Sequence, residues 1–141
     1  MRRLSFEIPG KPGAKQRPRH TRGGHTYTPE QTVNYENLVK VCFREKYPGF
    51  VPIDEPVMMD ISAAFPIPES WSKKKKMLAL GQDIYPGKPD WDNIGKIVSD
   101  ALNGIAYTDD SLVTICVVSK HYSSYPHVSV TILTRRLDEN E

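Results

Sequence analysis

The chain has 141 residues, 26% of them charged, and a formal net charge of only +2, so bulk charge alone assigns no partner. This length suits one compact domain, residues 1–141, that can bury a core without zinc or disulfide support. No segment is long and apolar enough to cross a membrane, and the N-terminus lacks a signal-peptide core, so we expect a cytoplasmic protein with no membrane contact.

The first predicted elements are a strand and a long basic loop. Leu4, Phe6 and Ile8 alternate with polar residues, which predicts a strand that ends at Pro9. Residues 10–28 are rich in Gly, Pro, Arg and Lys and contain little apolar material, so they predict a loop. A loop of this length inside a small domain is usually functional or disordered.

A helix is predicted after the basic loop. Thr28 is a suitable N-cap, Pro29 is a suitable first helical residue, and the Pro-Gly pair at 48–49 predicts the end. Both cysteines of the chain stand alone in apolar segments, which predicts buried, reduced thiols. The residues expected on the apolar face are Val33, Leu38, Val41 and Cys42, and the second cysteine is Cys116.

The second half of the chain predicts two helices and three strands. The clearest element is a helix at 92–103, in which apolar residues recur at helical spacing and Asn103-Gly104 supplies a left-handed stop. The order β-α-β-α-α-β-β predicts an α+β domain, a small mixed sheet with helices packed against it. The other predicted elements are a strand at 57–65, a short helix capped by Ser70 or Ser72, strands at 112–119 and 127–133, and a frayed tail at 135–141.

Carboxylates and a lysine gather at the start of the 92–103 helix. Asp90 and Asp92 stand two residues apart and project to the same side of an extended approach to the helix. Lys96 lies one turn beyond Asp92, opposite the apolar stripe, and Asp100 lies one turn further. A hard cation such as Mg²⁺ prefers oxygen ligands, and beside a phosphodiester it activates water while a lysine stabilises the developing charge. The pattern therefore indicates metal-dependent chemistry on a phosphodiester.

A plainer interpretation of these acids stays open. Asp92 is a suitable N-cap, and an Asp-x-Asp at a helix start is often only a cap and a partner of the helix dipole. The pair Asp109-Asp110 adds carboxylates, yet it also suits a solvated turn. An EF-hand calcium loop is excluded, because Ile94 and Ala101 occupy positions where that loop needs ligands. Trp91 lies between the first two acids, so we expect its side chain to point inward.

The combined pattern resembles a known family, the RusA family of Holliday-junction resolvases. The resemblance covers nearly the whole chain, and its N-terminal part is similar to the opening of phage and prophage members. The matching residues are Lys-Pro-Asp-Trp-Asp-Asn at 88–93, Lys96, Asp-Ala-Leu-Asn-Gly at 100–104, Asp109-Asp110, Pro9-Gly10, Lys15, Arg17-Pro18-Arg19, Tyr27-Thr28-Pro29 and the segment 68–76.

The resemblance implies a homodimeric, Mg²⁺-dependent endonuclease that cuts branched DNA at four-way junctions in recombination and repair, with Mn²⁺ as a substitute metal. It implies that the three aspartates of the catalytic set bind the metal, that Asp109 is a further candidate ligand, and that Asp100 has a supporting role such as holding the lysine in place. The implied catalytic residues are Asp90, Asp92, Lys96 and Asp110.

Two basic clusters are expected to hold the DNA. Arginines and lysines interleaved with Gly, His and Tyr suit phosphate contacts and stacking, and a lysine run on a short helix presents at most two side chains to one partner. Solvated surface is the alternative for both clusters. The candidate DNA-binding residues are Lys11, Lys15, Arg17, Arg19 and Arg22 in the loop and Lys73, Lys74, Lys75 and Lys76 in the helix.

The sequence therefore agrees with three functions. The first is a metal-dependent endonuclease that resolves junctions, the second is a non-catalytic junction-binding accessory protein, and the third is the same nuclease chemistry on flaps or forks. The acidic set favours a nuclease, because concentrated negative charge on a DNA-facing surface repels phosphates unless a cation is present.

Overall fold

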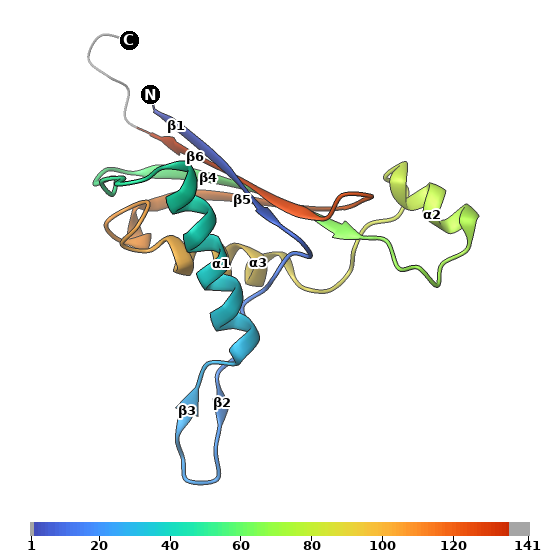
Figure 1. Ribbon diagram of the computed structural model, residues 1–141, viewed down its shortest axis with the longest axis horizontal. Helices are drawn as coiled ribbons and strands as arrows, with labels where there is room; N and C mark the ends of the chain where they lie inside the picture. Colours follow the sequence, from blue (N-terminus) through green and yellow to red (C-terminus); the bar gives the residue numbers. More distant parts are fainter. Residues whose placement is uncertain (1, 136–141) are drawn as a thin grey trace.

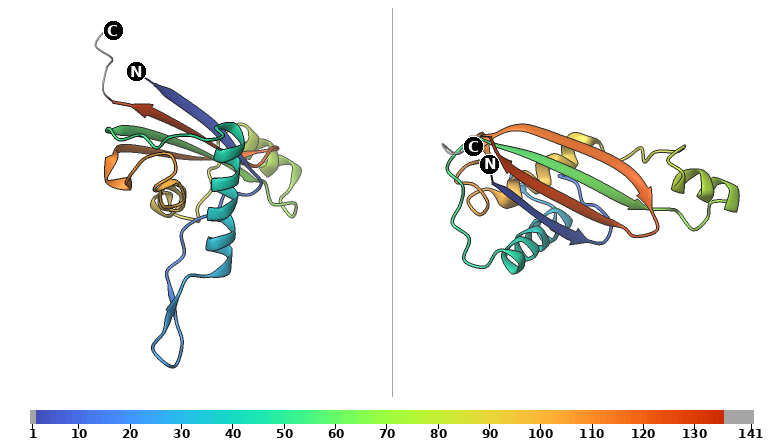
Figure 2. Two further views of the ribbon diagram at one scale, coloured as in Figure 1. Left: turned by 60° about the vertical axis from the view of Figure 1, so that its left-hand side comes forward. Right: turned by 90° about the horizontal axis from the view of Figure 1, so that it is seen from above.

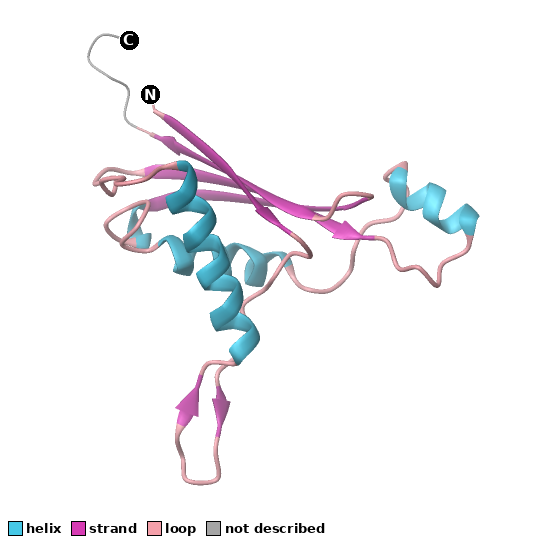
Figure 3. Cartoon of the chain, in the orientation of Figure 1, coloured by secondary structure: helices cyan, strands magenta, loops and turns pink. Residues whose placement is uncertain are grey.

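The computed structural model describes residues 2–135, in which helices pack against one four-stranded sheet (Figures 1 and 3). The elements follow the predicted order with two additions, a short hairpin and a 3₁₀ turn; apart from Arg135, the tail predicted at 135–141 lies outside the described residues. The elements are β1 (Arg3–Pro9), β2 (Arg19–His20), β3 (Thr26–Tyr27), α1 (Glu30–Lys46), β4 (Val57–Pro66), α2 (Lys73–Leu80), α3 (Trp91–Leu102), η1 (Asp110–Leu112), β5 (Val113–Ser123) and β6 (His127–Thr134).

The sheet is mixed, with strand order β1-β6-β4-β5. β6 runs antiparallel to both β1 and β4, whereas β5 runs parallel to β4. A parallel pair needs a crossover connection, and α2 and α3 provide it between β4 and β5. The predicted α+β class is therefore confirmed. The same topology leaves β5 at an edge of the sheet, beside α3.

Helices cover only one face of the sheet (Figure 2). α1 and α3 lie together beneath it, and no helix of the described chain covers the opposite face. The covered face follows the strand alternation, since every second residue of β4 from Val57 to Phe65 is buried. Phe43 of α1 meets Phe6 of β1 edge to face, with ring centroids 5.4 Å apart. Each such fully buried side chain contributes about 1.5–3 kcal/mol through removal from water.

α1 turns to this core a face that only partly agrees with the prediction: Leu38 and Cys42 pack against the core as expected. Val33 and Val41 were expected to be buried but are 42% and 49% exposed. The aromatic ring of Phe43 fixes the rotation of the helix, because it packs between Phe6 and Phe50. The residues of α1 that are buried are Thr32, Val39 and Phe43.

Two smaller predictions for this region are also wrong. The N-cap position is Pro29, which has no side-chain cap, so Thr28 does not cap the helix and the first helical residue is Glu30. The two cysteines are free thiols as expected, but Cys42 is only partly buried and Cys116 is exposed because it lies on the edge strand β5.

Two segments extend away from the sheet (Figure 1). The first is the predicted basic loop, whose outer part is a hairpin: β2 pairs with β3, with Arg19 opposite Tyr27 and His20 opposite Thr26. We call residues 16–28 the arm; every side chain from 20 to 28 is exposed. The second segment is α2, which lies beyond the end of the sheet and is capped by Ser72, one of the two predicted caps. No helix within residues 2–135 is long and apolar enough to cross a membrane.

Candidate functional site

The first turn of α3 carries two of the predicted catalytic acids. The helix is strongly amphipathic, and its apolar residues Ile94, Ile97, Val98, Ala101 and Leu102 are all buried, as predicted. Its polar residues therefore face outward. The N-cap position is Asp90 rather than Asp92, and Asp92 lies in the first turn, where the helix dipole favours a negative charge.

Acids from two separate segments line one cavity at the junction of α3, η1 and β5. The cavity has a volume of about 320 Å³. Four residues with predicted roles meet there: two metal ligands, the catalytic lysine and the supporting acid. Three of these four side chains come from α3. We call it the acid cavity, and its charged residues are Asp92, Lys96, Asp100 and Asp110.

Asp110 reaches the acid cavity because the loop after α3 folds back on the helix. Its backbone N–H donates a hydrogen bond to Asn103 Oδ1 at 3.1 Å, just beyond the end of α3. Gly104 follows with φ of +77°, the predicted left-handed stop. The hydroxyl of buried Tyr107 donates to Ser99 O at 2.7 Å and anchors the returning loop.

The neighbouring carboxyls of Asp109 and Asp110 hydrogen-bond each other. This bond lowers the pKa of Asp109 and raises the pKa of Asp110, whose pKa is raised further by the nearby negative charges of Asp109 and Asp100, while Lys96 opposes the rise. Asp109 and Asp110 thus place two interacting carboxyl groups at the edge of the acid cavity.

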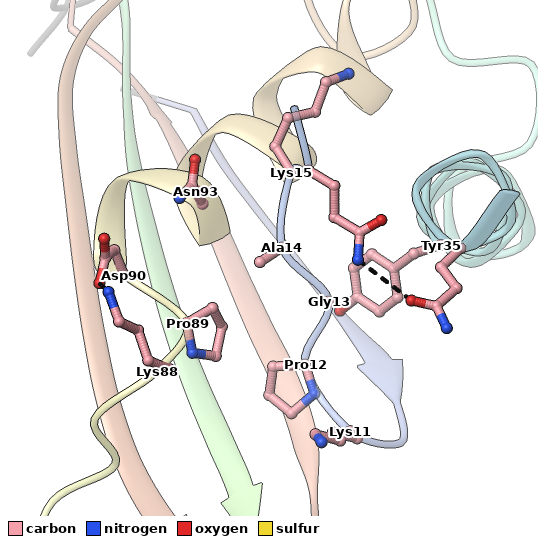
Figure 4. Close-up of a pocket in the computed structure, with 12 residues that line it drawn as sticks. Lys11, Pro12, Gly13, Ala14, Lys15, Tyr35, Lys88, Pro89, Asp90 and Asn93 are labelled. Atoms are coloured by element: carbon pink, nitrogen blue, oxygen red, sulfur yellow. Dashed lines mark hydrogen bonds and ion pairs between the residues drawn. The ribbon is translucent and has the colours of Figure 1, made fainter. Parts of the chain in front are cut away.

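Asp90 lies apart from the acid cavity. Lys88 Nζ contacts its Oδ1 at 3.0 Å, and both residues line a second cavity of about 640 Å³ (Figure 4). The other wall of that cavity is the segment 11–16, which we call the strap. Lys120 of β5 holds the backbone segment that precedes Asp90. Its Nζ donates hydrogen bonds to the carbonyl oxygens of Gly87 and Pro89, at 2.5 and 3.1 Å. Asp90 and Asp92 were expected to project to the same side; instead they line different cavities.

The residues present suit a hard cation only in part. Within residues 2–135, no group of three or more His, Cys, Asp or Glu side chains is arranged to hold a metal ion. Mg²⁺, however, often uses only one or two carboxylates and keeps several waters. Asp92 and Asp110 are the predicted ligands that the acid cavity brings together, with Asp109 hydrogen-bonded to the second of them.

Lys15 of the strap connects α1 to α3. Its Nζ lies 2.6 Å from Glu36 Oε1 and 3.2 Å from Asp100 Oδ2, and its backbone N–H donates to Asn93 O at 2.8 Å. Burial lowers the pKa of Lys15, but hydrogen bonds to Glu36 and Asp100 outweigh that effect and raise it. The ion-pair partner of Asp100 in the described chain is thus Lys15, whereas the sequence suggested Lys96.

The other basic candidates lie on three exposed surfaces. Arg17 and Arg22 are exposed on the arm, and Lys11 lies at the start of the strap. Three of the four lysines of α2 are exposed, and Lys75 lies over the Trp71 ring, 4.0 Å from its centroid. These positions leave the arm and α2 free to meet a polyanion: the arm extends below the helical layer, and α2 lies beyond one end of the sheet (Figure 1).

Sequence reasoning missed two features of the site. Trp91, expected to point inward, is 62% exposed and lines the acid cavity, because the next residues of α3 already fill the core. Lys120 gave no signal, since a lysine in a strand near the C-terminus forms no motif. Spacing gave no signal for the exposure of Trp91 either, because it lies three residues before Ile94, where the buried stripe begins.

Comparisons with known proteins match nearly the whole length of the chain. The family model described as "Endodeoxyribonuclease RusA" matches residues 9–133, which include the strap, the arm and all the predicted acids. A similar protein is the "Uncharacterized protein YqaN" of Bacillus subtilis (strain 168), which is 39% identical over 135 residues. That match covers 92% of this chain and 94% of the relative.

Proposed function

Because the chain belongs to the RusA endodeoxyribonuclease family, we propose that it is a Mg²⁺-dependent, structure-selective endonuclease that resolves four-way DNA junctions. The observation that supports this most is the acid cavity, where Asp92 and Lys96 of α3 meet Asp110 of a separate segment. Carboxylates beside an exposed lysine serve phosphodiester hydrolysis, whereas a surface that only binds DNA gains nothing from them.

Each residue of the acid cavity has a distinct task in this proposal. Asp92 and Asp110 would hold the metal, and Asp90 would become a third ligand only by turning from Lys88 and its own cavity toward the acid cavity. When bound, Mg²⁺ activates a water for in-line attack and neutralises charge on the phosphate. The Lys96 ammonium stabilises the negative charge that develops on the phosphate oxygens. Asp100 is held by its ion pair with Lys15 and so keeps a fixed position in the wall of the acid cavity that Lys96 also lines.

The basic surfaces hold the substrate. The arm extends below the helical layer and α2 lies beyond one end of the sheet, so these two basic surfaces can contact different arms of a branched DNA. Such contacts are electrostatic and position the duplex without reading its sequence.

We also propose a homodimer, because a four-way junction is two-fold symmetric and needs two cuts. The edge strand β5 is the surface that suits a second copy: it pairs only with β4, and it exposes Ile115 and Val117 at 38% and 43%. Replacing Val117 with Glu should convert a dimer to a monomer in sedimentation equilibrium. A wild-type protein that sediments as a monomer contradicts the dimer without affecting the nuclease proposal.

Cleavage of an immobile four-way junction tests the proposed activity directly. The wild type should make paired, symmetric nicks with Mg²⁺ and none with EDTA, and duplex should remain uncut. Asp92→Asn should lose cleavage by several orders of magnitude while binding the junction at least as tightly, because the mutation removes repulsion of the phosphate. Asp83→Asn is the matched control, since it removes an exposed carboxylate outside the acid cavity.

Two results contradict the proposal in different ways. Tight junction binding without metal-dependent cutting identifies a non-catalytic accessory protein. Preferential cutting of flaps or forks keeps the chemistry and replaces the substrate.

A further inference from the structure

One wall of the acid cavity is apolar, although phosphodiester hydrolysis requires only charged and polar groups. Beside the acids, the cavity is lined by apolar side chains of β5 and by an indole of α3. These residues are Trp91, Val113, Cys116 and Val118.

Gly95 brings this wall and the acids close together. A Cβ at position 95 would lie 3.1 Å from Val118 Cγ2 and 3.7 Å from Cys116 Sγ, so α3 lies directly against β5 at this point. The first turn of the helix, with Asp92 and Trp91, is therefore set at the side of the apolar strand residues. A ligand that fills the cavity contacts the charged and the apolar part at once.

Trp91 provides a large flat surface in this wall. It is 62% exposed, and within residues 2–135 no aromatic ring or cation is stacked on it. The other tryptophan is different: Trp71 packs edge to face on Tyr122 at 5.2 Å and carries Lys75 on its ring. A single exposed aromatic is ordinary on a protein surface, but this one adjoins Asp92, Lys96 and Asp110 in one cavity.

We propose that Trp91 and the apolar wall form a stacking site for the nucleobase next to the phosphodiester that is cut. This inference rests on the proposed nuclease function and specifies its substrate: DNA with an unstacked base at the cut. Lys96 meets the phosphate, and the indole meets the face of the attached base. Every base has a π-face, so the site accepts any sequence.

Stacking on Trp91 favours branched DNA over duplex. Inside a duplex both faces of a base are covered by its neighbours, and exposing one requires unpairing and unstacking. At a branch point the bases are already partly unstacked, so the same contact forms at a smaller cost. The aromatic wall thus adds a selection for structure to the non-selective attraction of the basic surfaces.

Tryptophan fluorescence tests the contact, because Trp71→Phe leaves Trp91 as the only tryptophan and preserves an aromatic ring against Tyr122. In EDTA, which prevents cutting, the emission of this variant should be quenched by a four-way junction and by single-stranded oligothymidine. A blunt duplex of the same charge should quench it far less. Quenching that is equal for duplex and junction, or absent for every DNA, overturns the stacking site.

Substitution of Trp91 itself supplies the second readout. Trp91→Ala should weaken junction binding by about 10-fold, the usual scale for removing one base–aromatic stack, and lower the ratio of junction to duplex binding. Trp91→Phe should restore most of both, and the salt dependence of binding should not change in either variant, since every phosphate contact remains. Unchanged junction affinity in Trp91→Ala contradicts the proposal.

The experiments separate this inference from the function on which it rests. If the wild type cuts no junction but the Trp91 emission is quenched by single-stranded DNA, the stacking site stands and the nuclease proposal fails. If junctions are cut but Trp91 emission shifts to the blue with protein concentration in the absence of DNA, the indole lies between two copies of the chain and the stacking site is refuted.

Discussion

Lys15 stands in a basic stretch, yet its ammonium contacts two carboxylates. It joins Glu36 of α1 to Asp100 of the acid cavity, and its backbone binds Asn93 of α3. Proximity in sequence to Arg17 suggested a DNA contact, but sequence proximity does not show which lysines are paired across the fold. A lysine that neutralises Asp100 leaves Asp92 and Asp110 as the carboxylates available to a metal.

Replacement of Lys15 by Met should lower the rate of junction cleavage more than the affinity for the junction. It should also lower the free energy of unfolding by about 1 kcal/mol, since the ion pairs are partly exposed. Single-turnover cleavage, binding in EDTA and urea unfolding measure the three effects. Lys15→Arg should retain most of the rate, and Lys40→Met on α1 serves as control; a purely binding defect in Lys15→Met disproves the positioning role.

Gly13 is required by the close approach of the strap to α1. A Cβ at this position would lie 2.5 Å from Cγ of Tyr35, a steric clash with the ring. Gly13→Ala should therefore lower the free energy of unfolding by about 1–3 kcal/mol, as overpacking does. Thermal unfolding measures this loss of stability. Gly87→Ala is the control, because a Cβ at that position meets nothing within 4 Å. Equal melting temperatures for the two variants show that the strap is free to move.

The predictability of each element from the sequence depends on how it is stabilised. α3 and β4 were predicted within two residues at each end. Their apolar residues recur at helical and strand spacing, and these same residues are buried in the core. The rotation of α1 was mispredicted, because its apolar residues extend around the helix and one aromatic contact decides among the faces. The β2–β3 hairpin was predicted as a loop, since it buries no apolar face and so has no alternation to detect.

The sequence predicted which residues belong to the candidate site better than it predicted which of them lie together in space. Asp92, Lys96 and Asp100 share a helix face, which spacing alone gives. That Asp110 joins them depends on the Asn103 contact of the returning loop, and that Asp90 lies apart depends on Lys88 and Lys120. Such side-chain contacts across loops have no periodic signature.

The arm is expected to bind DNA without contributing to stability. Arg17 and all side chains from 20 to 28 are exposed, so Arg17→Ala and Arg22→Ala together should leave urea unfolding unchanged. Junction binding should weaken, and the slope of log affinity against log salt should become shallower by about 0.9 for each phosphate that the variant no longer neutralises. Arg44→Ala, an exposed arginine of α1, is the control. An unchanged salt slope assigns the DNA contacts to another surface.

At the scale of the whole molecule, the buried Tyr107 and the partly buried Tyr35 connect stability to alkaline pH. Burial raises the pKa of Tyr35 to about 12 and also raises the pKa of Tyr107. Because the folded state holds these protons more tightly than the unfolded chain does, the stabilisation is complete below pH 10. It is lost as pH rises from 10 toward 12, by about 1.4 kcal/mol per pH unit for each group.

The free energy of unfolding should therefore fall steeply above pH 10 in urea titrations. Tyr107→Phe should fall less steeply, although it is less stable at pH 7 by about 1 kcal/mol because the bond to Ser99 is absent. Tyr125→Phe should follow the wild type, since this side chain is 56% exposed. If the free energy of unfolding falls with pH at the same rate in the wild type and in Tyr107→Phe, Tyr107 is not the source of the loss of stability.

The two strands of the arm leave the sheet-and-helix domain side by side, so relatives can differ in the length of this hairpin. Gln16 and Gln31 are bonded across its base at 3.2 Å, and the paired register continues outward from there. Residues can be added or removed in pairs at the tip without disturbing the strap, α1 or the core. In the proposed complex with DNA, the length of the hairpin therefore sets the distance between the cut and the phosphates that the arm contacts. Exchanging hairpins between relatives would transfer reach while leaving the chemistry in place.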